Sequence, residues 1–276
     1  MNALLIIAGN EFKRAVRNRW IAATTLLMLA LSLSLSLLGS APTGSVDADR
    51  LGITIVSLSS LSIFLIPLIA LMLSYDAIVG EIENGTMLLL LTYPVRRWQI
   101  VTGKFLGHTA VLTVATVLGY GSSGLAIGLL ESNANMETWM AFLMMCVSSI
   151  LLGMAFVALG YLVSALVRER GTAAGLAVAV WLLFVLLFDM ALLGALVADQ
   201  GQTLKANTVT ALMMLNPADI YRMFNLTGSP DIAALAGMAG VGESLRLPSS
   251  VLAGSLLMWS LLPIGLAIMA FKRREL

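Results

Sequence analysis

The sequence is poor in the residues from which most catalytic sites are built. Among its 276 residues there is one cysteine, Cys146, and one histidine, His108. They cannot form a disulfide within the chain or complete a zinc site. Charged residues make up only 11% of the chain, against about 25% in soluble domains. The net charge of +1 offers nucleic acid no basic surface. The composition therefore argues against a soluble enzyme and against a nucleic-acid-binding protein.

Motifs for nucleotide and metal chemistry are missing as well. The chain has no Gly-x-x-x-x-Gly-Lys-[Ser/Thr] loop that could hold a nucleotide triphosphate, no His-Glu-x-x-His and no Gly-x-Ser-x-Gly. Any ATP hydrolysis connected with this protein must therefore occur on another polypeptide. We expect a chain that is not itself an enzyme and that holds no cofactor.

Apolar residues dominate the chain instead, and 59% of it is hydrophobic. A helix needs about 20 apolar residues to cross the hydrocarbon core of a bilayer. Six stretches qualify, at residues 21–38, 51–75, 105–130, 138–167, 171–198 and 247–271. The sequence thus predicts one all-α integral membrane domain over residues 1–276, with six transmembrane helices in contact with lipid.

Lysine and arginine residues are distributed unevenly between the connecting segments. If the N-terminus is cytoplasmic, twelve of the 16 lie inside and four lie outside, at Arg50, Lys205, Arg222 and Arg246. Positively charged loops resist translocation, so this distribution favours both termini in the cytoplasm.

The N-terminal residues 3–19 repeat apolar positions at helical spacing. Leu5, Phe12 and Val16 are among those on one side, and Glu11 falls with basic residues largely on the other. This pattern predicts an amphipathic helix in the membrane interface. A simple topogenic anchor needs only the positive charges and is compatible with the same sequence.

The segment 76–104 between the second and third spans carries an unusual apolar run. Met87–Leu91 is too short to cross a bilayer and too apolar for an exposed loop. Its charged neighbours are Glu81 and Glu83 before the run and Arg96 and Arg97 after it. The run either docks on a partner or packs against the ends of its own helices.

The outer segment 198–250 is long for a connection within a helical bundle. Residues 208–215 and 220–226 have helical spacing, and an Asn216-Pro217-Ala218-Asp219 turn that can cap a helix separates them. We expect short helices that lie on the outer surface.

Few polar residues fall inside the predicted spans. Asp189, in the fifth span, is a candidate for gating or cargo contact, although its position near the outer face also fits a structural role, and no partner for it is evident. Ser57, Ser60 and Ser74, in the second span, could line a polar pathway or simply allow close helix packing.

Three methionines, Met136, Met140 and Met144, follow one another at four-residue intervals in the fourth span. Thioethers bind Cu(I), so they are weak candidates for a copper path. Methionine is also common apolar filler in such helices.

Several motifs resemble those of the ABC-2 family of ATP-binding-cassette permeases. They are Gly80-Glu81-x-Glu83-x-Gly85-Thr86, Leu88–Leu91, Tyr93-Pro94-Val95 and Gly103-Lys104-Phe105, and the six-span order supports them. The strings Asp76–Glu81 and Leu215–Arg222 are similar to membrane subunits of nitrous-oxide-reductase maturation transporters. The resemblance covers essentially the whole chain and implies a bacterial inner-membrane protein.

The resemblance implies a coupling hairpin at residues 76–104 that binds a separate ATPase subunit. Its implied coupling residues are Glu81, Glu83, Gly85, Thr86, Met87, Leu88, Leu89, Leu90, Leu91, Arg96 and Arg97. ATP and Mg²⁺ would bind to that ATPase, which would resemble NosF. A homodimer with two ATPase subunits is the implied assembly.

For the subfamily, the resemblance also implies a periplasmic partner like NosD. The residues expected to contact it are Asn216, Pro217, Asp219, Tyr221 and Arg222. The implied task is export of a sulfur-containing species for the copper-sulfur centre of nitrous-oxide reductase. Two alternatives remain: an exporter of lipid, drug or copper, and a scaffold that transports nothing.

Overall fold

The computed structural model describes residues 3–38, 50–130, 136–199, 206–226 and 247–275, and regular structure in these ranges is helical throughout. The all-α prediction is confirmed there. The long helices are α2 (Arg19–Leu38), α3 (Arg50–Ser74), α6 (Arg97–Leu130), α7 (Met136–Leu166) and α14 (Ser249–Arg273). One further long segment consists of α8 (Arg170–Leu182), the π-helix η1 (Leu183–Leu187) and α9 (Phe188–Asp199). The short helices are α1 (Ala3–Val16), α4 (Val79–Glu83), α5 (Thr86–Leu91), α10 (Ala206–Met213) and α11 (Pro217–Leu226).

By length and composition, five described segments can cross a membrane. They run from Leu51 to Glu83, Arg97 to Leu129, Met136 to Leu166, Arg170 to Asp199 and Ser249 to Arg273. Helices α1 and α2 together make a sixth candidate that is bent by 70°. The chain is thus a membrane protein with five or six candidate spans, and its orientation stays a prediction.

The helix that contains the third predicted span begins before residue 105. Helix α6 starts at Arg97, so residues 97–104, assigned to the hairpin from the sequence, form its first turns. The expected start at residue 105 rested on the charge of Lys104. That side chain is buried among carboxylates, so its charge does not end the helix or the bundle.

Helix α7 lies at the centre of the bundle and packs against α3, α6 and α14. Two of its glycines occupy positions where a side chain would collide with a neighbour. Gly153 faces Leu112 of α6, and Gly160 faces Ser74 of α3. These contacts let α3 and α6 approach α7 closely, and the helices build one hydrophobic core.

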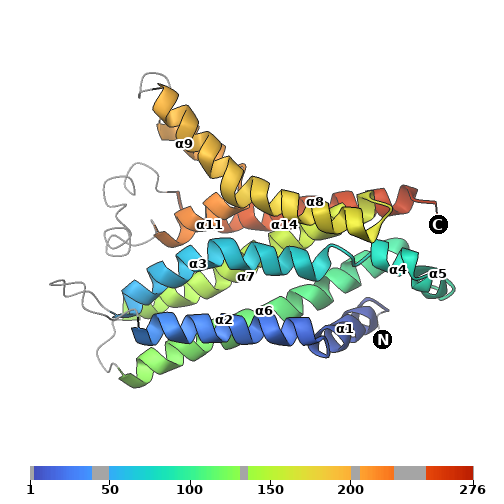
Figure 1. Ribbon diagram of the computed structural model, residues 1–276, viewed down its shortest axis with the longest axis horizontal. Coiled ribbons are helices and arrows are strands. Elements are labelled where there is room, and N and C mark those ends of the chain that lie inside the picture. Colours follow the sequence, from blue (N-terminus) through green and yellow to red (C-terminus); the bar gives the residue numbers. More distant parts are fainter. Residues whose placement is uncertain (1–2, 39–49, 131–135, 200–205, 227–246, 276) are drawn as a thin grey trace.

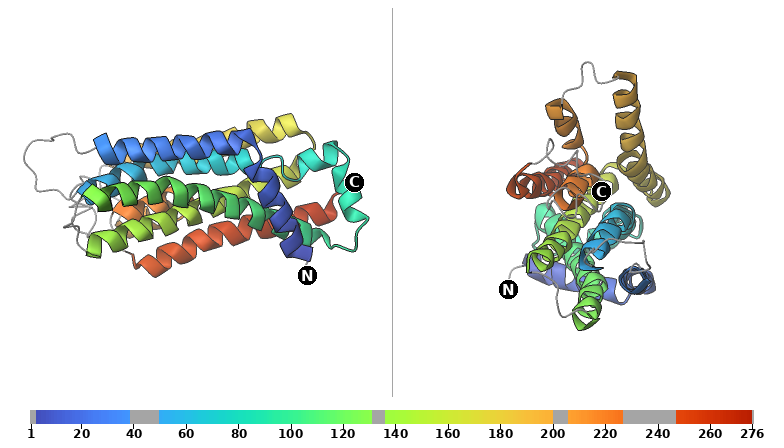
Figure 2. Two further views of the ribbon diagram at one scale, coloured as in Figure 1. Left: turned by 90° about the horizontal axis from the view of Figure 1, so that it is seen from below. Right: turned by 90° about the vertical axis from the view of Figure 1, so that its left-hand side faces the viewer.

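The two chain ends and the α4–α5 hairpin lie at the same end of the bundle (Figure 1). Helix α1 crosses that end at a steep angle to α2 (Figure 2). The α8–α9 segment is the least covered, since only 11% of its most apolar stretch is buried. Its α9 half diverges from the other helices in Figure 1.

Candidate functional site

The hairpin predicted from the sequence consists of α4 and α5, joined by a tight turn. Gly85, in that turn, has a φ of 70°, the left-handed conformation that glycine adopts without a Cβ clash. The Thr86 hydroxyl donates a 3.2 Å hydrogen bond to the Glu81 carbonyl oxygen, which closes the turn. The chain therefore reverses here and places α5 at the tip of the molecule (Figure 1).

The apolar run of the hairpin divides into buried and exposed residues. Met87 is fully buried, and Leu90 and Leu91 pack partly against the core. Leu88 and Leu89 are 56% and 67% exposed. Self-packing therefore explains the first group, whereas the second group is open to a partner.

The base of the hairpin is tied to the central helix. The Ser164 hydroxyl oxygen of α7 accepts hydrogen bonds of 3.0 Å from both the Ile78 and the Val79 backbone amides. These amides open α4 and lack partners within the helix, so Ser164 satisfies them. One turn earlier on α7, Gly160 allows the close contact with Ser74. The base of the hairpin is therefore anchored on α7.

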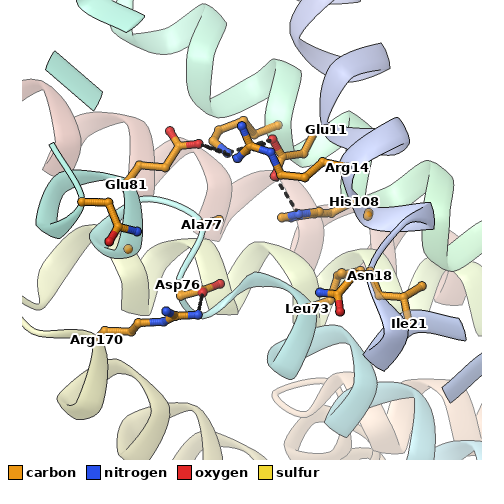
Figure 3. A pocket seen from close by; sticks show the side chains of 14 residues that line it. Glu11, Arg14, Asn18, Ile21, Leu73, Asp76, Ala77, Glu81, His108 and Arg170 are labelled. Carbon is orange, nitrogen blue, oxygen red and sulfur yellow. Dashed lines mark hydrogen bonds and ion pairs between the residues drawn. The ribbon is translucent and has the colours of Figure 1, made fainter. Parts of the chain in front are cut away.

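A buried lysine joins the hairpin to α1. Lys104 Nζ, on α6, lies 2.9 Å from Glu11 Oε2 of α1 and 2.9 Å from Glu81 Oε1 of α4, and its side chain is 3% exposed. Arg14 Nη1 also contacts Glu81 Oε1, at 3.1 Å, from the exposed side. Figure 3 shows Glu11, Arg14 and Glu81 turned toward one another. Three elements thus meet in one ion cluster.

The cluster continues to α7 through the single histidine. His108 Nε2 lies 3.2 Å from Glu11 Oε1, and its Nδ1 lies 2.9 Å from the Tyr161 hydroxyl. A carboxylate only accepts, so in neutral His108 the proton is assigned to Nε2, and Tyr161 donates to Nδ1. The polar contacts therefore run from α4 through α6 and α1 to α7.

Glu11 is held as a carboxylate by these neighbours. Burial by itself raises its pKa, but the hydrogen bond from His108 and the charge of Lys104 outweigh burial and lower the pKa from 4.5 to about 2. The sequence pattern had placed Glu11 on the polar side of α1, whereas it faces α6 and is buried. Leu5 and Val16, expected to pack with the apolar side, are 66% and 54% exposed, as suits a helix in contact with lipid.

Two further contacts join the hairpin region to the start of α8. Arg170 Nη2 lies 2.5 Å from Asp76 Oδ2, and the Arg170 backbone amide donates a 2.7 Å hydrogen bond to Glu83 Oε1. The Arg170 and Asp76 side chains are 53% and 28% exposed. Glu81 and Glu83, predicted as an outer charged rim, therefore contact the chain's own helices.

A polar cavity of about 200 Å³ lies between these elements. It adjoins a second cavity of about 330 Å³, and the two share Asn18, Ile21, Leu73, Asp76 and Arg170 in their walls (Figure 3). The ionic contacts around it pair carboxylates with basic groups. Asp76 and Arg170, which pair with each other, line both cavities.

The basic residues after the hairpin have different surroundings. Arg96 is exposed. Arg97 Nη1 donates hydrogen bonds of 2.8 Å and 2.7 Å to the carbonyl oxygens of Phe271 and Arg274, and its guanidinium lies 5.3 Å from the Phe271 ring centre. Arg97 thus caps the end of α14. Its assignment as an ATPase contact stays a prediction.

At the other end of the bundle, Asp189 has a partner that the sequence did not reveal. Its Oδ2 lies 2.6 Å from Arg222 Nη2, and Arg222 Nη1 lies 2.7 Å from Asp219 Oδ1. Asn216 Nδ2 donates hydrogen bonds to Asp219 Oδ2 at 3.0 Å and to the Phe184 carbonyl in η1 at 2.8 Å. This group holds α11 against the η1–α9 segment.

The 216–222 segment, which the sequence predicts to contact a periplasmic partner, lies mostly inside the bundle, and that contact stays a prediction. Asn216, Pro217, Asp219 and Tyr221 are buried, and Arg222 is half-buried. Helix α11 packs against α3, α7 and α14, and the Tyr221 hydroxyl meets Ser149 Oγ at 2.9 Å. The Asp219, Tyr221 and Arg222 side chains of α11 have polar partners within the bundle.

The predicted pathway residues are not brought together. Ser60 is exposed and Ser57 is half-buried. Ser74 is buried, and it lies 17 residues after Ser57, which is about 25 Å along α3. The Ser60 and Ser74 hydroxyls donate to the carbonyls of Val56 and Ala70, at 2.8 and 2.7 Å. Their contacts agree with packing rather than with one lined route.

The methionine stripe lies on the outside of α7. Met136, Met140 and Met144 are 80%, 51% and 44% exposed. Among the described residues, no group of three His, Cys, Asp or Glu side chains could hold a metal ion beside them. The stripe therefore has the position of a lipid-facing surface.

Sequence reasoning missed the central role of Lys104. The available signal was the spacing of Lys104 and His108, which places both on one face of α6 and within reach of one carboxylate on a neighbouring helix. Gly103 and Gly107, next to these two residues on α6, lie where α1 approaches.

Sequence comparisons with known proteins identify the family of this chain. The family model described as "ABC-2 family transporter protein" matches residues 5–276. The chain is 44% identical over 276 residues to the "Probable ABC transporter permease protein NosY" of Stutzerimonas stutzeri, with 99% of each chain covered. It is also 44% identical over 277 residues to the protein of that name in Pseudomonas aeruginosa, with 100% of each covered. The chain belongs to the ABC-2 family of transporter proteins.

Proposed function

We propose that this permease is driven by a separate ATPase subunit, resembling NosF, that binds the α4–α5 hairpin. The chain lacks a nucleotide-binding loop, so ATP and Mg²⁺ bind to the ATPase. Closure of the ATPase pair displaces the hairpin, and the contacts at its base pass that movement to the spans. The protein acts as a homodimer with two ATPase subunits, because ATPases of this kind work in pairs and one chain supplies half of a symmetric assembly.

The exposure of Leu88 and Leu89 is the observation that carries this proposal. Helix α5, which carries both leucines, lies at the tip of the molecule (Figure 1), and Met87 on the same helix is fully buried. Exposed Glu83 and Arg96 flank them in the chain. An apolar centre with a charged rim is the usual composition of a protein–protein interface.

The cargo we propose is a sulfur-containing species used to assemble the copper-sulfur centre of nitrous-oxide reductase. Full-length similarity to two proteins named NosY supports this assignment. A periplasmic protein like NosD would receive the product of transport.

The test is co-purification with the ATPase subunit expressed together with the permease. Leu89→Asp places a charge in the apolar centre of the interface, so we expect the ATPase to be lost while the permease remains in the membrane. The matched control is Leu215→Asp, because Leu215 is 57% exposed and lies outside the hairpin, between α10 and α11. Undiminished recovery of the ATPase with Leu89→Asp would contradict the proposed docking site.

Transport is tested separately, in inverted vesicles that contain both subunits. ATP should drive the uptake of radiolabelled sulfur compounds from a cell extract, and the Leu89→Asp variant should abolish it. ATP hydrolysis without any uptake would favour a scaffold that transmits movement but carries no cargo.

A further inference from the structure

The attachments of the hairpin differ in how far they exclude water. The Lys104 contacts to Glu11 and Glu81 are buried, since the three side chains are 3%, 11% and 14% exposed. The Asp76–Arg170 contact to α8 is open to solvent, with side chains 28% and 53% exposed. Water can replace the partners of the exposed pair at little cost. Breaking the buried contacts would leave charges without partners inside the protein, which is strongly unfavourable.

Helix α1 is held close to α6, so the Lys104 contact is not a loose tether. A Cβ atom on Gly103 would lie 2.9 Å from Ile7 Cβ, and one on Gly107 would lie 2.7 Å from Glu11 Cβ. Only glycine permits this approach. It places the Glu11 carboxylate where its two oxygens contact Lys104 and His108.

Two carboxylates face two basic side chains around Lys104. Glu11 and Glu81 contribute two negative charges, and Lys104 and Arg14 contribute two positive ones, with both basic groups in contact with Glu81. Glu81 is the member that comes from the hairpin, whereas Lys104 and Glu11 come from α6 and α1. Removal of Glu81 therefore separates the hairpin from the cluster and still leaves Lys104 paired with Glu11.

We propose that Lys104 is a positioning residue that fixes α1 to the coupling hairpin, so that the two move as one body while the contact with α8 yields. This inference rests on the proposed function, because it needs an ATPase that displaces the hairpin. It assigns the direction of coupling: α1, α6 and the hairpin keep their mutual distances, and the cavity beside Asp76 and Arg170 changes its width.

The test measures distances between pairs of spin labels in the permease–ATPase complex, without nucleotide and with ATP plus vanadate. Labels are placed on cysteines introduced at the exposed positions Asn84 in the hairpin, Lys13 on α1 and Thr172 on α8, in a Cys146→Ser background. In the otherwise unchanged protein, nucleotide should shift the 84–172 distance and leave the 84–13 distance unchanged.

The decisive variant is Glu81→Met, which removes the carboxylate that joins the hairpin to Lys104. We expect the 84–13 distance to become nucleotide-dependent, while the ATPase still co-purifies. The matched control is Asp76→Asn, because Asp76 lies just before the same short helix but pairs with Arg170 of α8 instead of Lys104. The control should keep the 84–13 distance fixed. Glu81→Gln retains an oxygen that can accept from Lys104 and should restore part of the coupling.

Three results would overturn the inference. The first is an 84–13 distance that nucleotide does not change in Glu81→Met. The second is an 84–13 distance that nucleotide does change in the unchanged protein. The third is an 84–172 distance that nucleotide does not change in the unchanged protein. Each can be obtained with the ATPase bound, which leaves the proposed function standing. Loss of the ATPase from the unchanged complex would instead refute the proposed function.

Discussion

Asp189 and Arg222 meet across two helices, with Asp189 Oδ2 of α9 2.6 Å from Arg222 Nη2 of α11. Arg222 also binds Asp219, which is fully buried. One guanidinium therefore serves two carboxylates from different elements. Together with the hydrogen bond from Asn216 to Phe184, this ties α11 to the least buried span of the bundle.

Replacement of this guanidinium should destabilise the outer half of the bundle. Arg222→Met leaves the fully buried Asp219 carboxylate and the partly buried Asp189 carboxylate without a counter-charge, and removal of one partner from a buried ion pair costs about 3–5 kcal/mol. We expect a lower melting temperature in detergent, measured by intrinsic fluorescence. In an Asp189→Asn background the same substitution should cost less, because one carboxylate is already gone. Equal losses in both backgrounds would show that the two residues act independently.

Acidic pH should weaken the attachment of α1. The pKa of Glu11 is about 2 in the folded protein, against 4.5 for a free glutamate. Because the folded pKa is the lower one, the stabilisation is fully present above pH 4.5 and is lost as the pH falls toward 2. The difference corresponds to about 3 kcal/mol. We expect the melting temperature to fall across this interval.

The control for this pH dependence is a pair of carboxylate-to-amide variants. Glu11→Gln removes the titrating group and should reduce the change of the melting temperature between pH 4.5 and pH 2. Glu137→Gln alters an exposed carboxylate in the first turn of α7, far from Glu11, and should leave the pH dependence of the melting temperature unchanged. The same pH dependence in Glu11→Gln as in the unchanged protein would assign it to other carboxylates.

Two glycines on α6 offer a test of the close contact with α1. An added Cβ at Gly107 would lie 2.7 Å from Glu11 Cβ and 2.8 Å from the Ala8 carbonyl oxygen, whereas one at Gly121 would meet nothing within 4 Å. Gly107→Ala should therefore displace α1 and speed hydrogen exchange of residues 3–16. Gly121→Ala should leave that exchange unchanged and gain up to about 1 kcal/mol from helix propensity. Slow exchange in both variants would mean that α1 does not depend on this contact.

The helical bundle could be predicted from the sequence because apolar length and charge distribution are local properties. Residues 51–75, 138–167 and 247–271 correspond closely to α3, α7 and α14. The prediction failed where a charged residue finds a partner from a distant part of the chain. The charge of Lys104 predicts that the apolar stretch begins at residue 105, but carboxylates 93 and 23 positions away in the sequence keep Lys104 inside the bundle.

The site was predictable only in part for the same reason. The hairpin and its exposed leucines follow from a short apolar run between charges. The inward direction of Glu81 and the burial of Tyr221 depend on which helices lie beside them, and one sequence does not specify that. Helix α11 has a polar face that suits water equally well, yet Ser149, Asp189 and the Phe184 carbonyl satisfy it inside the protein.

The turn at Gly85 gives a last test of the hairpin as the ATPase contact. Its φ of 70° costs a residue with a side chain about 1–2 kcal/mol, and a β-branched residue more. Gly85→Val should therefore distort the turn and weaken ATPase binding by about tenfold, measured by titration of the purified subunits. Gly85→Asn should bind nearly as the unchanged protein does, because asparagine tolerates the left-handed conformation. Since the two variants differ chiefly in backbone preference, equal affinities would show that ATPase binding does not depend on the shape of this turn.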